Sequence, residues 1–309
     1  MSYSIVFPGQ GSQSVGMLSE LAENFQIVKE VFQEASDTLS IDLWKMCQTD
    51  GDSLNQTINT QPAMLAAGYA TFKVLKGEID LNSQSFAGHS LGEYSALVAA
   101  DSIEFSDAIK LVRKRAELMQ DALPSGTGGM AAILGLSDEE VINVCLGYKG
   151  EGVVEPVNFN SPGQVVVAGS KEAVDDICEL MKEAGAKRAI PLQVSVPSHC
   201  SLMNSASDEF AEFISETNIQ LPNRSVIHNV DALPSDNIDQ IKQKLIDQIK
   251  KPVLWTQTIE NMSNLGVEKI IECGPGNVLA GLTRRINKSL SANAIIDKSS
   301  LKETIKEIS

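Results

Sequence analysis

The chain alternates short apolar runs of strand length with longer segments in which apolar residues recur every three or four positions. Two of the short runs, 5–7 and 269–272, each lead into a glycine-rich stretch, where a strand would end. The helical spacing is clear over 107–121, where apolar residues form one face. Short strands that alternate with helices predict an α/β layered fold with a mostly parallel sheet.

Residues from about 126 to 197 follow a self-contained pattern of their own. Strands are expected at 130–134, 153–159, 164–168 and 188–194. One helix starts at a capping box formed by Ser137 and Glu140, and a second is capped by Ser170 and stops at Gly185. The order βαββαβ is that of a ferredoxin-like unit, which can stand in a host domain as an insertion.

The length of 309 residues, of which 43% are hydrophobic, allows a large core and a second, smaller lobe. We therefore expect a small ferredoxin-like domain over residues 126–197. The large α/β domain would be discontinuous in sequence and would comprise residues 1–125 and 198–309.

Composition disfavours several classes of protein. The formal net charge of −15 argues against nucleic-acid binding, which needs a basic face. Five scattered cysteines show neither a disulfide framework nor paired metal ligands, which fits a reducing cytoplasm and no metal site. No apolar stretch approaches the roughly 18 residues of a membrane span, and the first residues lack a leader pattern, so we expect a cytoplasmic protein away from membranes.

The most informative chemical feature is a Gly-x-Ser-x-Gly pattern at 88–92, with Ser90 at its centre. Flanking glycines permit a sharp strand-to-helix turn that presents the serine as a nucleophile for acyl carbons. Composition alone would produce such a pentapeptide in roughly one chain of this length in ten. A weakly strand-like run at 83–88 and a helix-compatible run at 91–100 fit a nucleophile elbow, and they fit an incidental glycine-rich helix start about equally well.

A serine nucleophile needs a base, and the chain has three histidines. His89 lies inside the serine motif, so its side chain should diverge from that of Ser90. His228 lies in a strand-like run, where packed structural histidines are more common than bases. His199 stands where the small domain would return to the large one, and clefts between domains favour ligands, so it is the candidate base. Its neighbour Cys200 is better explained as a packed thiol than as a nucleophile, and no aspartate stands out as the orienting group.

Arg115 borders the apolar face of the helix over 107–121, at spacings of three from Val112 and four from Met119. A guanidinium turned toward the interior needs an anionic partner, because an unpaired buried charge is costly. A carboxylate of the protein is the simpler partner, and the carboxylate of a bound substrate is the more specific alternative.

Residues 8–16 form a glycine-rich loop after the first strand. Its glycine spacing does not match the dinucleotide-binding fingerprint, and it lacks the Gly-Lys-Ser/Thr of a phosphate-binding loop. The loop is better suited to donate backbone N–H groups to an active site.

Motifs stand in one order along the chain at 7–13, 61–63, 88–94, 156–164, 196–199 and 272–276. Together they resemble those of malonyl-CoA:acyl-carrier-protein transacylases, enzymes that load malonyl groups onto a carrier protein. The resemblance runs to about residue 290 and implies an α/β-hydrolase-like large domain with a ferredoxin-like insertion. The chain departs from the family pattern at Ala116, where glycine is common, and at Cys273, where a small apolar residue is usual.

The resemblance also implies a role for each candidate residue. The roles would fall on Ser90 (acyl-bearing nucleophile), His199 (general base), Arg115 (malonyl carboxylate), Gln10 and Leu91 (backbone N–H donors to the oxyanion) and Gln248 (backbone carbonyl that orients the histidine). A carbonyl in that position would account for the missing aspartate.

The implied reaction is ping-pong transfer of malonyl from coenzyme A, through a Ser90 ester, to the phosphopantetheine thiol of acyl carrier protein for fatty acid synthesis. Both thioesters are substrates, and no cofactor or metal is expected. A monomer is expected, and an acidic carrier would dock on the basic residues Arg113, Lys114, Arg284, Arg285 and Lys288. A hydrolase that uses the same serine and a non-catalytic carrier-docking module are the alternatives.

Overall fold

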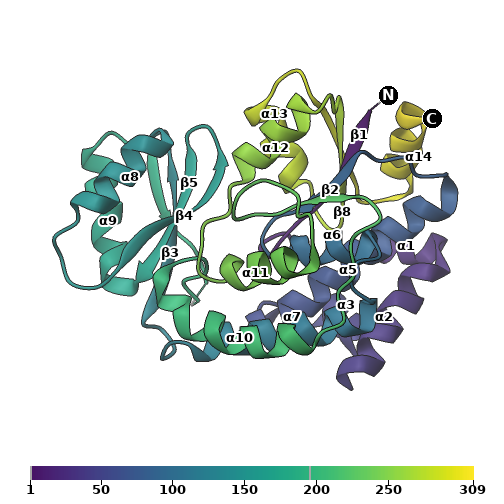
Figure 1. Cartoon of the computed structure of the whole chain (residues 1–309), viewed down its shortest axis with the longest axis horizontal. Helices are drawn as coiled ribbons and strands as arrows, with labels where there is room; N and C mark the ends of the chain where they lie inside the picture. Colours follow the sequence, from purple (N-terminus) through teal and green to yellow (C-terminus); the bar gives the residue numbers. More distant parts are fainter. Residues whose placement is uncertain (1, 195) are drawn as a thin grey trace.

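The computed structural model describes residues 2–194 and 196–309 and contains two separate sheets, each with its own helices (Figure 1). The larger sheet is parallel throughout, in the order β7-β2-β1-β8-β9. Its strands are β1 (Tyr3–Phe7), β2 (Ser85–Gly88), β7 (Ser225–Ile227), β8 (Lys269–Cys273) and β9 (Ser291–Ile295). The predicted parallel sheet is confirmed, and the residues that follow β1, β2 and β7 meet at its carboxyl edge.

Helices surround the parallel sheet, as the alternating pattern predicts (Figure 1). They are α1 (Ser19–Asn24), α2 (Gln26–Leu39), α3 (Leu43–Thr49), α4 (Gly51–Leu54), α5 (Thr57–Glu78), α6 (Gly92–Ala99), α7 (Phe105–Asp121), α10 (Asn204–Glu216), α11 (Ile238–Gln248), α12 (Trp255–Asn264), α13 (Val278–Ile286) and α14 (Lys298–Ile308), with the 3₁₀ turn η1 (Ser201–Met203). Every residue of α6 is buried, so the helix that follows the serine motif lies in the core. The helix expected over 107–121 is α7, which begins two residues earlier.

The smaller sheet is antiparallel, in the order β4-β5-β3-β6. Its elements are β3 (Gly128–Leu134), α8 (Asp138–Gly147), β4 (Val154–Ser161), β5 (Gln164–Ser170), α9 (Lys171–Glu183) and β6 (Arg188–Pro191). Val165 and Val167 pack beneath α8 and α9, while Val166 and Ala168 face the other way, toward Cys200 of the large domain. The sheet therefore has two apolar faces, and the predicted ferredoxin-like order βαββαβ is confirmed.

Two local predictions in this region need correction. The capping box of Ser137 and Glu140 is present, but the Ser170 side chain does not cap α9. Its hydroxyl accepts the backbone N–H of Val153 at 3.0 Å instead, so it joins two segments of the small sheet. The strand expected over 188–194 ends at Pro191, and Leu192 and Val194, which follow it, line a cavity.

Backbone hydrogen bonds tie the small sheet to the large domain. The N–H of Phe159 donates to the carbonyl of Val253 at 3.0 Å, and the N–H of Val253 donates to Val157 at 2.8 Å. In addition, Glu155 accepts the backbone N–H of Ser201 at 3.0 Å. These contacts fix the two lobes against each other. The domain boundaries near residues 125 and 198 stay a prediction.

Candidate active site

Ser90 lies at a sharp turn between β2 and α6, with φ at +51°. A Cβ atom on Gly88 would lie 1.8 Å from the carbonyl carbon of Gly92, and one on Gly92 would lie 2.0 Å from the carbonyl oxygen of Phe7. Neither position can hold a side chain, because the turn is packed against itself and against the end of β1. This geometry is that of a nucleophile elbow and not of an incidental helix start.

His199 lies beside the serine hydroxyl although the two residues are far apart in sequence. Its Nε2 is 2.8 Å from Ser90 Oγ, and its Nδ1 is 2.6 Å from the backbone carbonyl of Gln248. Because a carbonyl can only accept, Nδ1 carries the proton and Nε2 is free to receive one from the hydroxyl. Burial, followed by the positive charge of Arg115, lowers the pKa of His199 to about 3 and keeps the imidazole neutral.

The side chain of Arg115 extends from α7 to the Ser90–His199 pair and is 1% exposed. One terminal nitrogen, Nη1, donates to Gln61 Oε1 at 2.7 Å. The other, Nη2, donates to Gln248 Oε1 at 2.9 Å and lies 3.3 Å from Ser90 Oγ. Its Nε has no hydrogen-bond partner among the described residues, and no Asp or Glu of that set forms an ion pair with it. The protein carboxylate that would be its simpler partner is therefore not observed.

A cavity of about 110 Å³ brings the three side chains together. It is lined by Gln10, Thr57, Gln61, His89, Ser90, Leu91, Arg115, Met119, Met130, Asn158, Leu192, Val194, Val196, Ser198 and His199. A larger cavity of about 710 Å³ shares Gln10, Thr57, Met119, Val194 and Val196 with it and continues along residues 120–125. The convergence of Ser90, His199 and Arg115 that the sequence predicts is thus present in the structure.

Gln10 and Leu91, whose backbone N–H groups are the expected oxyanion donors, line this cavity as well. Gln10 lies in the loop after β1, and Leu91 is the residue before α6. Within the described part of the chain, neither N–H donates to a protein oxygen, whereas those of the neighbouring residues His89 and Gly92 do. Two donors beside a nucleophilic hydroxyl can stabilise a negative oxygen on an attacked carbonyl.

The matching family model is described as an acyl transferase domain and covers residues 4–304. The chain belongs to the acyl transferase family. A relative from Haemophilus influenzae, named malonyl CoA-acyl carrier protein transacylase, is 50% identical over 300 residues, which is 96% of each chain. The resemblance based on the sequence motifs is confirmed.

Solved structures share the fold of this acyl transferase domain. An acyl carrier protein S-malonyltransferase from Vibrio cholerae is 52% identical, with a TM-score of 0.96 over 98% of this chain and 100% of that one. A malonyl-transacylase in complex with a type II polyketide acyl carrier protein is 47% identical, with a TM-score of 0.98 over 99% of this chain and 100% of that one. The fold class expected from the sequence is confirmed by these neighbours.

The other reactive side chains considered from the sequence have structural partners. His228 Nδ1 lies 2.7 Å from Glu93 Oε1, and both are buried. His89 diverges from Ser90, and its Nε2 lies 2.7 Å from Asn160 Oδ1. Cys200 is buried, which raises the pKa of its thiol to about 12 and keeps it protonated. None of the three replaces the Ser90–His199 pair.

The five basic residues proposed for docking lie in two groups, not in one patch. Arg113 and Lys114 belong to α7, whereas Arg284 and Arg285 belong to α13 and Lys288 follows it. Figure 1 shows α7 toward the lower edge of the molecule and α13 at the upper edge. The sequence locates these charges on helices but does not show how far apart the helices lie.

Arg113 also has a structural partner that the sequence did not indicate. Pro62 lies inside α5 and has no N–H to donate to the carbonyl of Ile58, four residues earlier. Arg113 donates to that carbonyl at 3.2 Å and to Asn59 Oδ1 at 3.0 Å, and its Nε pairs with Glu117 at 3.0 Å. Arg113 therefore links α7 to α5, and Glu117 partly neutralises its charge.

Sequence reasoning assigned no role to three side chains that surround the site. Gln61 accepts a hydrogen bond from Arg115. Asn229 accepts the backbone N–H of Ser90 in the elbow, and Glu93 accepts the side-chain amide of Gln248. Gln61 belongs to a motif that the sequence comparison singled out. Asn229 stands two residues after β7, and side chains at the carboxyl ends of parallel strands commonly face the active site, which could have drawn attention to it.

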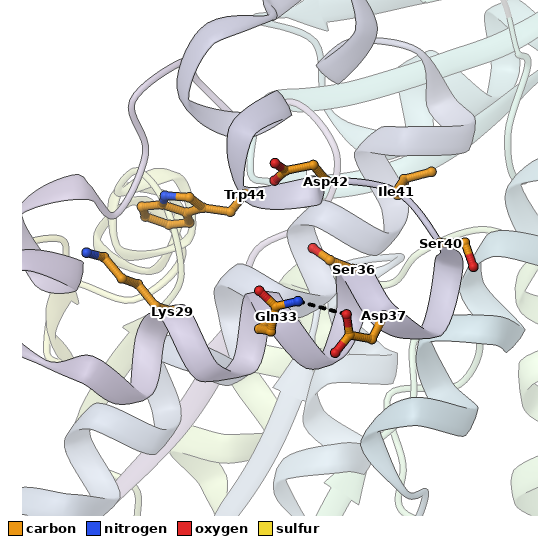
Figure 2. A pocket seen from close by; sticks show the side chains of 8 residues that line it. All are labelled: Lys29, Gln33, Ser36, Asp37, Ser40, Ile41, Asp42 and Trp44. Atoms are coloured by element: carbon orange, nitrogen blue, oxygen red, sulfur yellow. Dashed lines mark hydrogen bonds between the residues drawn. The ribbon is translucent and has the colours of Figure 1, made fainter.

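A separate hollow of about 640 Å³ lies between α2 and α3 (Figure 2). It is lined by Lys29, Gln33, Ser36, Asp37, Ser40, Ile41, Asp42 and Trp44, and Gln33 donates to Asp37 at 2.7 Å along α2. None of these residues lines the cavity of Ser90. In residues 2–194 and 196–309, no cluster of three His, Cys, Asp or Glu side chains could hold a metal ion, and no helix there has the length and apolarity needed to cross a membrane.

Proposed function

We propose that this chain is an acyl-carrier-protein S-malonyltransferase, which moves malonyl from coenzyme A to the phosphopantetheine thiol of acyl carrier protein. The observation that supports it best is one small cavity lined by a serine–histidine pair and by Arg115, a buried arginine that forms no ion pair with an Asp or Glu of the described residues. A nucleophile beside a fixed positive charge suits an acyl group that carries a carboxylate at its far end. The names of the relatives agree with this choice.

In the first half-reaction Ser90 Oγ attacks the thioester carbonyl of malonyl-CoA while His199 Nε2 takes the hydroxyl proton. The N–H groups of Gln10 and Leu91 bind the oxyanion, each contributing about 2.7–4 kcal/mol in the transition state. The carbon–sulfur bond then breaks, and His199 returns its proton to the leaving coenzyme A thiolate. The Gln248 carbonyl holds the imidazole in the required orientation throughout.

In the second half-reaction His199 takes the proton of the carrier's phosphopantetheine thiol, and the thiolate attacks the Ser90 ester. The carbon–oxygen bond breaks and the proton returns to Ser90 Oγ. Both thioesters are substrates, and the chemistry needs no further cofactor. The larger cavity beside the site has room for the pantetheine arm that coenzyme A and the carrier share. Ping-pong kinetics follow, because the first thiol leaves before the second binds.

Arg115 selects the acyl group by binding the malonyl carboxylate. Its Nε is unpartnered among the described residues, while Gln61 and Gln248 hold the rest of the guanidinium in place. A planar fork of donors matches a carboxylate better than a point charge does. Acetyl-CoA offers no carboxylate, so it leaves this buried charge without its partner and is a poor substrate.

Intact-mass spectrometry after mixing with malonyl-CoA tests the function. We expect one malonyl adduct on the wild-type chain, its loss in Ser90→Ala and its retention in Ser95→Ala, a matched buried serine on α6. Adding holo carrier protein should remove the adduct and yield malonyl-carrier. No adduct, or an adduct that survives Ser90→Ala, contradicts the serine-ester mechanism, and release of free malonate in place of malonyl-carrier identifies a hydrolase.

We propose that the acidic carrier docks on one of two basic groups, which are Arg113 and Lys114 of α7, and Arg284 and Arg285 of α13 together with Lys288 after it. Lys114→Glu tests the first group, and Lys288→Glu the second. Reversing the correct charge should slow transfer to the carrier and leave loading of Ser90 unchanged. If both half-reactions weaken alike, docking lies elsewhere.

The five cysteines are unpaired and buried, which fits the cytoplasmic location expected from the sequence.

A further inference from the structure

The carboxamide of Asn229 bonds to both sides of the serine elbow. Its Oδ1 accepts the backbone N–H of Ser90 at 2.7 Å, and its Nδ2 donates to the carbonyl of Gly88 at 2.7 Å. Asn229 is 0% exposed, and Ser90 between the two bonds has φ at +51°. Such a backbone conformation is sparsely populated and persists only where its surroundings enforce it. Asn229 supplies that enforcement from the turn after β7, which is remote from Ser90 in sequence.

A buried carboxylate holds Asn229 itself. Glu93 Oε2 accepts the backbone N–H of Asn229 at 3.0 Å and Gln248 Nε2 at 2.9 Å. Its other oxygen, Oε1, lies 2.7 Å from His228 Nδ1. Gln248 Nε2 also donates to the backbone carbonyl of Ser90 at 2.8 Å. One carboxylate therefore joins the support of the elbow to Gln248, whose backbone carbonyl orients the base.

We propose that Asn229 is a positioning residue, which holds the Ser90 hydroxyl at the distance and angle that attack on the thioester requires. This inference rests on the proposed serine-ester mechanism. Asn229 does not line the cavity with Ser90 and does not touch the reacting atoms. A displacement of about 1 Å in a reacting group can lower a rate by about 10²-fold, so loss of its two bonds should appear in the rate of acylation.

The replacement Asn229→Asp gives a readout that a purely structural role does not. A protonated aspartic acid can accept from Ser90 N–H and donate its O–H to the Gly88 carbonyl, as asparagine does. An ionised one presents a second acceptor to that carbonyl and a negative charge to Glu93. Burial and the nearby carboxylate favour the protonated form of the new side chain, and raising the pH removes its proton. Asn229→Leu has a similar shape and neither bond at any pH.

The experiment measures single-turnover acylation of Ser90 by saturating malonyl-CoA, with rapid quench and intact-mass detection, between pH 5 and 9. The ratio of the Asn229→Asp rate to the wild-type rate should fall as pH rises. Asn229→Leu should be slower than wild type by about 10²-fold across that range, with KM for malonyl-CoA within threefold. Asn261→Asp is the matched control, because Asn261 Nδ2 also donates to a backbone carbonyl, that of Ala232 at 2.9 Å, which is not part of the serine elbow.

A flat Asp-to-wild-type ratio, or an Asn229→Leu variant with lowered melting temperature but a wild-type acylation rate, overturns the positioning role. The positioning role is also overturned if the ratio of the Asn261→Asp rate to the wild-type rate falls equally as pH rises. Absence of any adduct on the wild-type chain defeats the serine-ester mechanism instead, so the two failures are distinguishable. The Asp variant keeps the shape of asparagine, and it therefore serves as the test even if the Leu variant does not fold.

Discussion

Replacement of Arg115 by alanine tests what the buried guanidinium is for. The structure separates its bonds into two kinds. Those to Gln61 and Gln248 are made within the protein, so their loss affects every acyl group alike. A carboxylate at the far end of a malonyl group adds an ion pair with the guanidinium that acetyl cannot form, so loss of that pair affects malonyl and spares acetyl. The ratio of kcat/KM for malonyl-CoA to kcat/KM for acetyl-CoA therefore isolates the contribution of the substrate carboxylate.

The size of the change follows from burial. Arg115 is 1% exposed, so water cannot replace it as partner of a bound carboxylate. Truncating one member of a buried, hydrogen-bonded charge pair costs about 2–5 kcal/mol. At about 1.4 kcal/mol for each tenfold change, the preference for malonyl-CoA over acetyl-CoA should fall by about 30- to 4,000-fold. Arg115→Lys should keep an intermediate preference, because it retains the charge and loses the planar fork.

The assay is kcat/KM for Ser90 acylation with malonyl-CoA and with acetyl-CoA. Arg113→Ala is the matched control, since it removes an arginine from the same helix whose bonds go to α5 and to Glu117. It should leave the preference unchanged. If Arg115→Ala lowers kcat/KM for malonyl-CoA and for acetyl-CoA by the same factor, the carboxylate role is wrong. The guanidinium then acts only on Ser90 and Gln248.

Three further expectations follow. The rate of Ser90 acylation should fall on the acidic side near pH 3 and not near 6.5, because the lowered pKa of His199 keeps the base neutral above pH 3. Arg115→Ala should move this acidic limb of the pH profile upward, because it removes a positive charge near His199. Burial raises the pKa of Glu272 to about 7, so its folded form binds protons more tightly than the unfolded one, and Glu272→Gln should raise the melting temperature more at pH 8 than at pH 5. Gly92→Ala should destabilise the fold by about 1–3 kcal/mol and abolish acylation, whereas Gly77→Ala, with open space at its Cβ, should stabilise it by about 0.4–1 kcal/mol.

Pre-steady-state pH profiles, thermal melts at the two pH values and urea unfolding check these outcomes. An acidic limb at pH 6.5 in the wild-type chain contradicts the effect of burial on His199. A Glu272→Gln effect that is the same at both pH values shows that the carboxyl does not titrate in the folded state within that range. A fully active Gly92→Ala variant shows that the elbow tolerates a side chain.

The sequence predicts the parts of the site that depend on local pattern. The strand, glycine and helix signals around Ser90 lie within a short stretch of chain, and the helical spacing of α7 places Arg115 on its buried face. The capping box at Ser137 is local in the same way. Each of these predictions needed only neighbouring residues, and the structure agrees with each.

Features that depend on contacts between distant segments escaped prediction. The Asn229 carboxamide meets the Ser90 backbone across 139 residues, and no periodicity in either segment indicates the other. Ser170 looked like a helix cap because its position is right, yet the N–H of Val153 takes its hydroxyl. The basic residues of α7 and α13 were grouped by charge, although the fold sets them apart (Figure 1).

Pro62 and Arg113 have a consequence for how sequences of this family can vary. Any other residue at position 62 would bring an amide hydrogen that competes with Arg113 for the Ile58 carbonyl. Conversely, loss of Arg113 beside an unchanged Pro62 would strand a helix carbonyl that has no donor of its own. The two positions are thus expected to co-vary, with chains that lack the proline also relieved of the need for arginine.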